Sequence, residues 1–110
     1  MKVYNRSEGD IPQGCVRIMR PSKWGNPYII GKDGDRRTVL RKYAVWLNDN
    51  LSDNDFLQDL KELSKASGLI CCCKPLDCHG DLLIQVMKKL GYIDISEFLN
   101  ASPKETAQEN

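Results

Sequence analysis

The apolar residues of the chain follow two spacings, one typical of strands and one typical of helices. Residues 2–5 and 15–19 are short runs of β-type residues, and each run predicts a short strand. Residues 69–73 are apolar at every position and are bounded by Gly68 and Pro75, a pattern that favours a buried central strand. Residues 28–30 could add a short extended segment.

Three further segments repeat their apolar residues at helical spacing. The first helix is predicted from its N-cap Asp35 to about Asn48. The second is capped by Ser52 or Asp53, and Gly68 is predicted to end it as a C′ glycine. The third covers residues 81–90. The three apolar faces consist of Val39, Leu40, Tyr43, Trp46 and Leu47; Phe56, Leu57, Leu60 and Leu63; and Leu82, Leu83, Val86, Met87 and Leu90.

The order of these elements predicts an α/β fold. We expect a small two-layer or three-layer sandwich, with a short, partly parallel sheet and about three main helices. A chain of 110 residues suits a single domain, which we place at residues 1–100 and which includes a short amphipathic piece at 96–99. Residues 101–110 are polar and predict a disordered tail.

Composition narrows the classes of function. A formal net charge of +1 argues against strong bulk attraction to nucleic acid or to an anionic membrane. The longest apolar run is too short to span a bilayer, and the N-terminus has no apolar signal-peptide core, so we expect a cytoplasmic protein with no membrane partner. Five cysteines are an odd number and in a reducing compartment would be thiols, thiolates or metal ligands.

Four of the five cysteines and the one histidine lie in the stretch CCCKPLDCHGD, residues 71–81. A first interpretation is a zinc site, because Cys71, Cys73, Cys78 and His79 could supply a Cys₃His ligand set. The spacing C-x-C-x₄-C-H is not a standard one. Adjacent ligands are also awkward, because neighbouring side chains tend to diverge.

A second interpretation of the same stretch is catalysis. Cys78 lies where a helix begins, and the helix dipole there lowers the pKa of a thiol and makes it a candidate nucleophile. His79 and Asp81 are candidate acid/base groups. A third interpretation is an anion-binding site at the floor of a pocket. The backbone N–H groups of residues 78–81 would hold the anion, and Gly80 would allow its close approach. A purely structural interpretation remains for every residue of the stretch and is favoured for Cys72, which would simply be buried.

The loop RPSKWGNP, residues 20–27, combines a cation, an aromatic ring and an amide within eight residues. Arg20 and Lys23 could hold phosphate, and Trp24 could stack on a base or sugar. The side-chain amide of Asn26 could form hydrogen bonds with a polar edge of the ligand. Gly25 would allow a positive φ. The alternative is that Trp24 fills one end of the core. Arg6 could join the two cations if both N-terminal strands run toward the loop.

Together these stretches resemble a known family. The chain is similar to a small uncharacterised domain family of bacteria and their phages. The resemblance rests on three motifs in this order: RPSKWGNP, RKYxxWL in a helix, and LxCxCxPxxCHGD. The resemblance spans roughly residues 2–90. It implies a bacterial or phage-infected setting and a site built from both motifs, but no activity. The positions it carries over are Arg20, Ser22, Lys23, Trp24, Gly25, Asn26, Pro27, Cys71, Cys73, Cys78, His79, Gly80 and Asp81. The family has a large aromatic residue where this chain has Cys72.

The leading expectation is a domain that binds a nucleotide-like or other phosphate-bearing small molecule between the loop and the CHGD helix start. Arg20, Ser22, Lys23, Trp24, Asn26 and Gly80 would bind the ligand. If the domain is an enzyme, it would hydrolyse or transfer a nucleotide or nucleoside through Cys78, His79 and Asp81. One alternative is a zinc-stabilised module that contacts protein or nucleic acid. Another is a phage accessory protein that sequesters a host nucleotide signal, or inhibits a host protein, without chemistry.

Overall fold

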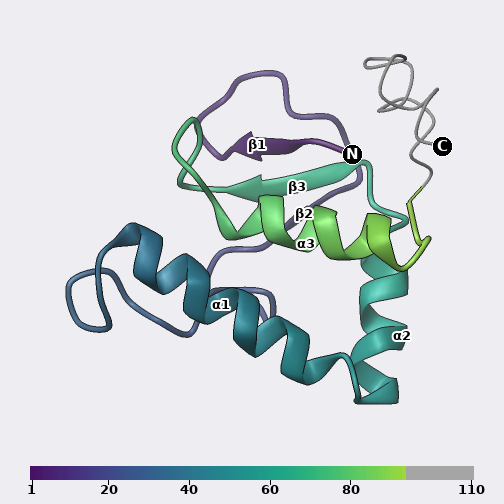
Figure 1. Cartoon of the computed structure of the whole chain (residues 1–110). Helices are drawn as coiled ribbons and strands as arrows, with labels where there is room; N and C mark the ends of the chain where they lie inside the picture. Colours follow the sequence, from purple (N-terminus) through teal and green to yellow (C-terminus); the bar gives the residue numbers. More distant parts are fainter. Residues whose placement is uncertain (94–110) are drawn as a thin grey trace, which may run out of the picture.

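The computed structural model describes residues 1–93 of the chain (Figure 1). The predicted amphipathic piece at 96–99 and the predicted tail at 101–110 lie outside the described residues. None of the helices in residues 1–93 is both long enough and apolar enough to cross a membrane.

Three short strands form the sheet: β1 (Val3–Asn5), β2 (Cys15–Arg17) and β3 (Gly68–Cys71). β3 lies in the centre, in the order β1-β3-β2, and both neighbours pair with it in parallel. The sheet is therefore wholly parallel, whereas the sequence predicted only a partly parallel one. The carboxyl ends of all three strands meet at one edge of the sheet, which is where ligands bind in open α/β sheets.

Three helices complete the described fold: α1 (Arg36–Asn50), α2 (Asn54–Leu63) and α3 (His79–Lys89). Asp35 caps α1 as predicted, because its side chain accepts from the N–H of Thr38. Of the two candidates for the cap of α2, Asp53 is the one that accepts, from the N–H groups of Asp55 and Phe56. Cys78 caps α3, so this helix begins two residues before the predicted start. Gly68 is not a C′ glycine, since α2 ends at Leu63 and Gly68 already belongs to β3.

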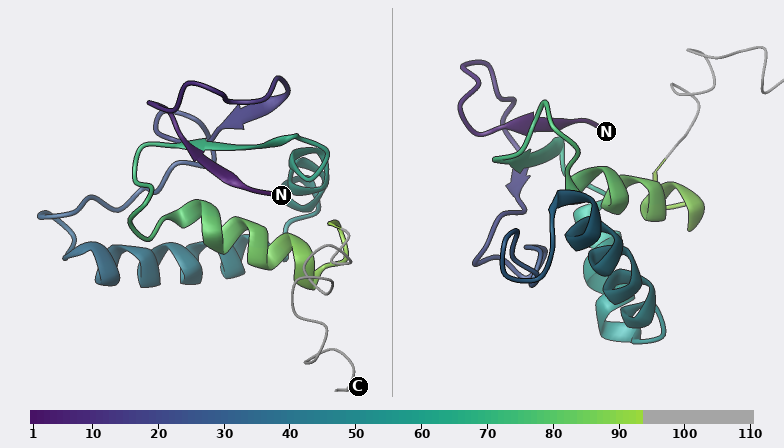
Figure 2. Two further views of the ribbon diagram at one scale, coloured as in Figure 1. Left: turned by 90° about the horizontal axis from the view of Figure 1, so that it is seen from above. Right: turned by 60° about the vertical axis from the view of Figure 1, so that its left-hand side comes forward.

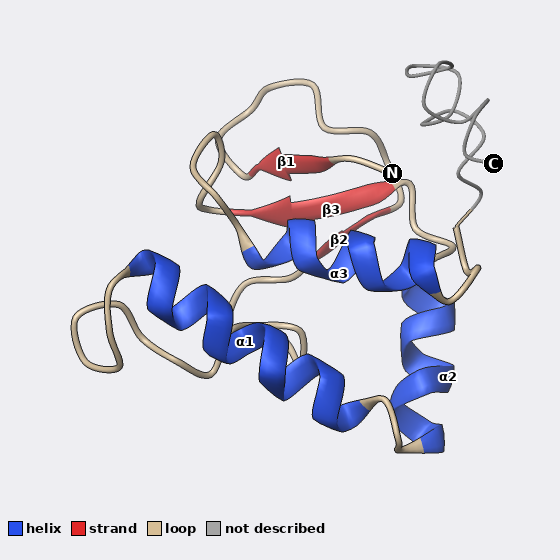
Figure 3. Cartoon of the chain, viewed as in Figure 1, coloured by secondary structure: helices blue, strands red, loops and turns tan. Residues whose placement is uncertain are grey.

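The helices cover one face of the sheet, and the fold has two layers. In the left view of Figure 2 the strands form one layer, and α1 and α3 lie side by side in the other; Figure 3 shows the same separation by element type. Leu69 and Cys71 of β3 face the helices and are fully buried. Ile70 points to the opposite face and stays half-exposed. The central strand is therefore buried on one face only.

The core lies between the sheet and the three helices. Its members are the buried residues Val3, Ile18, Trp24, Tyr43, Leu47, Phe56, Leu60, Leu63, Leu69, Cys71, Cys78, Leu83, Ile84 and Met87. Cys72 is exposed, so the prediction that it is buried is wrong. The reason is that β3 ends at Cys71, and the chain turns away from the sheet before α3 begins. Residues 28–30 form no strand and belong to a turn region.

Candidate functional site

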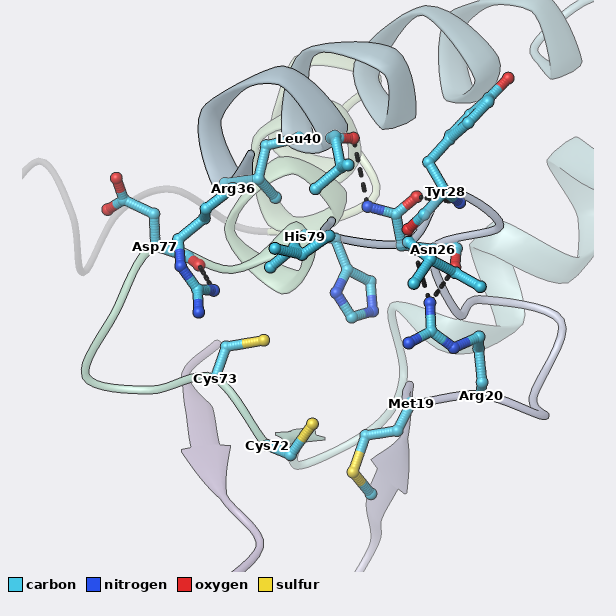
Figure 4. Close-up of a pocket in the computed structure, with 13 residues that line it drawn as sticks. Met19, Arg20, Asn26, Tyr28, Arg36, Leu40, Cys72, Cys73, Asp77 and His79 are labelled. Carbon is cyan, nitrogen blue, oxygen red and sulfur yellow. Dashed lines mark hydrogen bonds between the residues drawn. The ribbon is translucent and has the colours of Figure 1, made fainter. Parts of the chain in front are cut away.

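A cavity of about 250 Å³ lies at the carboxyl edge of the sheet (Figure 4). Three segments that are far apart in sequence form its wall: residues 19–30 after β2, the first turns of α1, and the turn from β3 into α3. Its apolar wall consists of Met19, Ile29, Ile30, Val39 and Leu40. Its polar and sulfur-containing wall consists of Arg20, Asn26, Tyr28, Arg36, Cys72, Cys73, Asp77 and His79.

The loop motif holds Arg20 in a defined position at this cavity. The Arg20 guanidinium donates hydrogen bonds to the carbonyl oxygens of Asn26, at 2.7 Å, and Tyr28, at 3.5 Å. The Asn26 side chain in turn donates to the carbonyl of Val39 in α1 and accepts from the N–H of Tyr28. The side-chain amide of Asn26 was predicted to form hydrogen bonds with the ligand. In the structure it connects the loop to α1 through its hydrogen bond to Val39.

A second arginine, which the sequence did not single out, faces the same cavity. Arg36 is the first residue of α1, and its guanidinium donates to the carbonyl oxygen of Asp77 at 3.2 Å. Within residues 1–93 neither Arg20 nor Arg36 pairs with a carboxylate. In the sequence, the only indication of a role for Arg36 was its position directly after the cap residue Asp35. That position does not show which part of the protein the start of the helix faces.

Ser22, Lys23 and Trp24 do not line the cavity. Trp24 is only 6% exposed and packs edge-on against Phe56, with the ring centroids 5.3 Å apart. Lys23 pairs with Asp59 of α2 and lies over the same two rings. The Ser22 hydroxyl accepts from the N–H of Trp24 within the loop. Trp24 has no open face for a ligand, and the core interpretation of this residue is the one that its burial supports.

His79 is part of the cavity wall, and each of its ring nitrogens lies near a polar atom or sulfur of the protein. Its Nε2 lies 2.7 Å from the carbonyl oxygen of Ile18. A carbonyl oxygen only accepts hydrogen bonds, so Nε2 carries the proton in the neutral ring and Nδ1 keeps its lone pair. Burial lowers the pKa of His79 and the nearby Arg20 cation lowers it further, while the hydrogen bond to Ile18 opposes both. Burial of the ring therefore favours its neutral form.

The thiol of Cys78 does not behave as the sequence predicted. Its side chain is 2% exposed, and burial raises its pKa well above the ordinary value. The N–H of Gly80 donates to the sulfur and opposes this rise, but the neighbouring thiols of Cys71 and Cys73 add to it. The prediction of a pKa lowered by the helix start is therefore wrong, because desolvation of the sulfur outweighs the hydrogen bond from the N–H of Gly80.

Three of the four predicted metal ligands come together. The Sγ atoms of Cys73 and Cys78 and a ring nitrogen of His79 all lie within 4.8 Å of one another. This is the only such group among residues 1–93. Cys71 is not part of it, although its sulfur lies close by and accepts the backbone N–H groups of Cys73 and Lys74, at 3.4 and 3.5 Å.

Gly80 and Asp81 support the helix rather than the cavity. A Cβ on Gly80 would lie 2.8 Å from Cδ1 of Ile18 and 3.0 Å from Cγ2 of Val3 in β1, so this glycine allows α3 to pack closely on the sheet. The Asp81 carboxylate accepts from the N–H of Cys78 at 3.3 Å and from Nζ of Lys74 at 2.8 Å. That is a capping box with an ion pair added. Neither residue lines the cavity.

Comparison with known proteins gives a family but no activity. Residues 2–89 match the family described as "Domain of unknown function (DUF4326)". A relative from Enterobacteria phage T4, the "Uncharacterized 12.4 kDa protein in nrdA-td intergenic region", is 28% identical over 90 residues, which are 81% of this chain and 79% of that protein. No solved structure matches the chain significantly. The family match covers most of the chain and confirms the resemblance seen in the motifs: the chain belongs to the DUF4326 family.

Proposed function

We propose that the cavity at the carboxyl edge of the sheet binds a small phosphate-bearing ligand of the nucleotide class. The observation that carries the proposal is the pair of guanidinium groups, Arg20 and Arg36, which reach one cavity from two separate elements. Guanidinium groups bind phosphate oxygens through paired, charge-assisted hydrogen bonds.

Both arginines are pre-positioned for this task. Two backbone carbonyl oxygens hold the Arg20 guanidinium and one holds that of Arg36, so each group keeps free N–H donors. Among residues 1–93 no carboxylate pairs with either charge. Holding them before binding reduces the entropy that the ligand must remove. An anionic ligand would supply the missing countercharge at both groups.

The rest of the wall suits the uncharged part of such a ligand. Met19, Val39 and Leu40 provide an apolar surface. Ligand pockets of this kind are mostly apolar, with a few convergent polar groups. The volume of about 250 Å³ lies just below the usual range of roughly 300–1,000 Å³, which favours a mononucleotide or a smaller phosphate ester.

Two versions of this proposal share the cavity. In one, the domain sequesters a nucleotide without chemistry, as an accessory protein of a phage would. In the other, it hydrolyses or transfers the bound group, and His79 is the predicted acid/base residue that lies at the cavity wall. This version requires that Nδ1 of His79 carries no metal, because Nε2 already donates to the carbonyl oxygen of Ile18. Turnover of the bound nucleotide separates the two versions.

A zinc-stabilised interaction module is the second candidate function. The observation that favours it is the cluster of Cys73, Cys78 and His79. Such a module would lose its fold when a chelator removes the metal, because structural zinc binding is coupled to folding.

The test is isothermal titration calorimetry of the full chain with AMP, ADP, GMP and inorganic phosphate. Arg20→Gln and Arg36→Gln each remove a charged donor, and we expect each to weaken binding by about 1.5–3 kcal/mol, roughly 10- to 100-fold. Arg37→Gln is the matched control, because Arg37 is the exposed neighbour of Arg36 in the same helix and does not line this cavity. Equal affinities in all three variants would contradict the proposal, as would the absence of any binding.

A further inference from the structure

We propose that Cys73, Cys78 and His79 form a zinc site with three protein ligands and that its fourth coordination position opens to the cavity. The donor atoms support the metal site independently of the ligand pocket. Only the use of the open position rests on the proposed function.

The distances between the donors are close to those that zinc requires. Tetrahedral zinc binds sulfur at about 2.3 Å and histidine nitrogen at about 2.0 Å, which sets neighbouring donors roughly 3.5–3.8 Å apart. Sγ of Cys78 lies 3.8 Å from Nδ1 of His79. The sulfur of Cys73 completes a group with no separation above 4.8 Å, which exceeds the tetrahedral spacing by about 1 Å at most.

The orientation of His79 is that of a metal ligand. A histidine bound to metal through one ring nitrogen usually donates the other N–H to a carboxylate or a backbone carbonyl, which fixes both the ring and its tautomer. Here Nε2–H donates to the carbonyl of Ile18 at 2.7 Å, and the lone pair of Nδ1 is on the side of the two thiols.

Cys78 and His79 are adjacent in sequence, and the backbone resolves this difficulty. Cys78 is the N-cap of α3 and has extended angles, φ −138° and ψ 147°, while His79 is already helical. The change of conformation between the two residues brings their side chains together. The N–H of Gly80 donates to the Cys78 sulfur at 3.3 Å, an interaction that stabilises a metal-bound thiolate.

The donor set selects the metal. Two thiolates and one imidazole suit zinc, whereas magnesium, calcium and manganese prefer oxygen ligands. The carboxylate of Asp81, in the first turn of the same helix, is already bonded to the Cys78 N–H and to Lys74. It is therefore not a fourth ligand in this arrangement.

The fourth position faces the cavity because Cys73 and His79 both line it. Figure 4 shows the sulfur of Cys73 pointing into the space that the arginines border. Zinc sites with three protein ligands leave one position for water or substrate. A phosphate oxygen at that position would lie on the side of the cavity that Arg20 and Arg36 border.

The experiment measures metal directly. The full chain, reduced and untagged, is loaded with zinc and dialysed, and its zinc content is measured by elemental mass spectrometry. The same chain loaded with cobalt(II), which adopts the geometry of zinc, reports the number of thiolates through the intensity of its sulfur-to-metal absorption. The variant is Cys73→Ser, because Cys73 is the least buried ligand; Cys72→Ser, next to it and exposed, is the matched control. Cys71→Ser tests the neighbouring thiol, and circular dichroism checks the fold of each variant.

We expect one zinc per chain, two thiolates in the cobalt spectrum, loss of zinc after dialysis in folded Cys73→Ser, and retention in Cys72→Ser and Cys71→Ser. A wild-type chain that retains no zinc would overturn the metal site. Three thiolates, together with zinc loss in Cys71→Ser, would overturn the open fourth position, since Cys71 would then close it. Zinc binding without nucleotide binding would overturn the ligand proposal alone, and nucleotide binding without zinc would overturn the metal site alone.

Discussion

The backbone of Gly25 lies directly against the backbone of Arg20. A Cβ at position 25 would lie 2.8 Å from the Arg20 nitrogen and 2.9 Å from its Cα and Cγ. Gly25 does not have the positive φ that the sequence suggested. Glycine is needed there because no side chain fits between the two ends of the turn, and this contact sets the position of Arg20 at the cavity.

We therefore expect Gly25→Ala to displace Arg20. Overpacking of this kind costs about 1–3 kcal/mol, and urea denaturation should show that loss of stability. The affinity for a phosphate-bearing ligand should also fall. Gly9→Ala is the control, because no atom lies within 4 Å of a Cβ at that position. A Gly25→Ala protein as stable as wild type, with the same affinity, would show that the loop tolerates the side chain.

Trp24 and Lys23 are adjacent, and we expect their alanine variants to differ sharply. Trp24→Ala opens a cavity in the core and should destabilise the protein by about 3–5 kcal/mol, as large aromatic truncations do. Lys23→Ala removes an exposed ion pair and should change stability by less than about 1 kcal/mol.

Ligand affinity tests whether Lys23 contacts the ligand directly or only pairs with Asp59 on the surface. If Lys23 held phosphate, Lys23→Ala would weaken binding while the fold stayed intact. We expect its affinity, measured by calorimetry, to match that of Lys65→Ala, which removes another exposed lysine that is paired with a carboxylate. A selective loss of affinity in Lys23→Ala would restore the role that the sequence suggested.

Asp81 acts on the helix start, so its replacement should reduce stability. Asp81→Ala removes the acceptor for the N–H of Cys78 and the partner of Lys74, and we expect a loss of about 1 kcal/mol in urea denaturation. Glu62→Ala is the control, because Glu62 is an exposed helical carboxylate whose ion pair with Lys65 is worth little. Equal stabilities of the two variants would argue against the capping role.

The sequence by itself determined the elements of the fold. Caps at Asp35 and Asp53 and helical repeats of apolar residues depend on contacts within a few residues, so they can be read from local pattern. The same local pattern led to two wrong predictions, that Gly68 ends α2 and that Cys72 is buried. Each lies at the end of an element, and where an element ends depends on the neighbouring strands and loops.

The site could be predicted only in part. Arg20, Asn26 and His79 were expected at the ligand, and they do line the cavity, but Arg36 and Tyr28 were not expected there. Residues at positions 20, 36 and 79 belong to three segments, and sequence spacing does not indicate which side chains of distant segments face one another.

Only the tertiary structure decided what each motif residue does. Trp24 and Asn26 stand in one short loop, yet one fills the core and the other ties the loop to α1. Cys78 and His79 are neighbours whose donors converge because an extended residue precedes a helix. Local sequence sets backbone conformation through short-range interactions, whereas burial and side-chain contact depend on how the sheet and helices pack together.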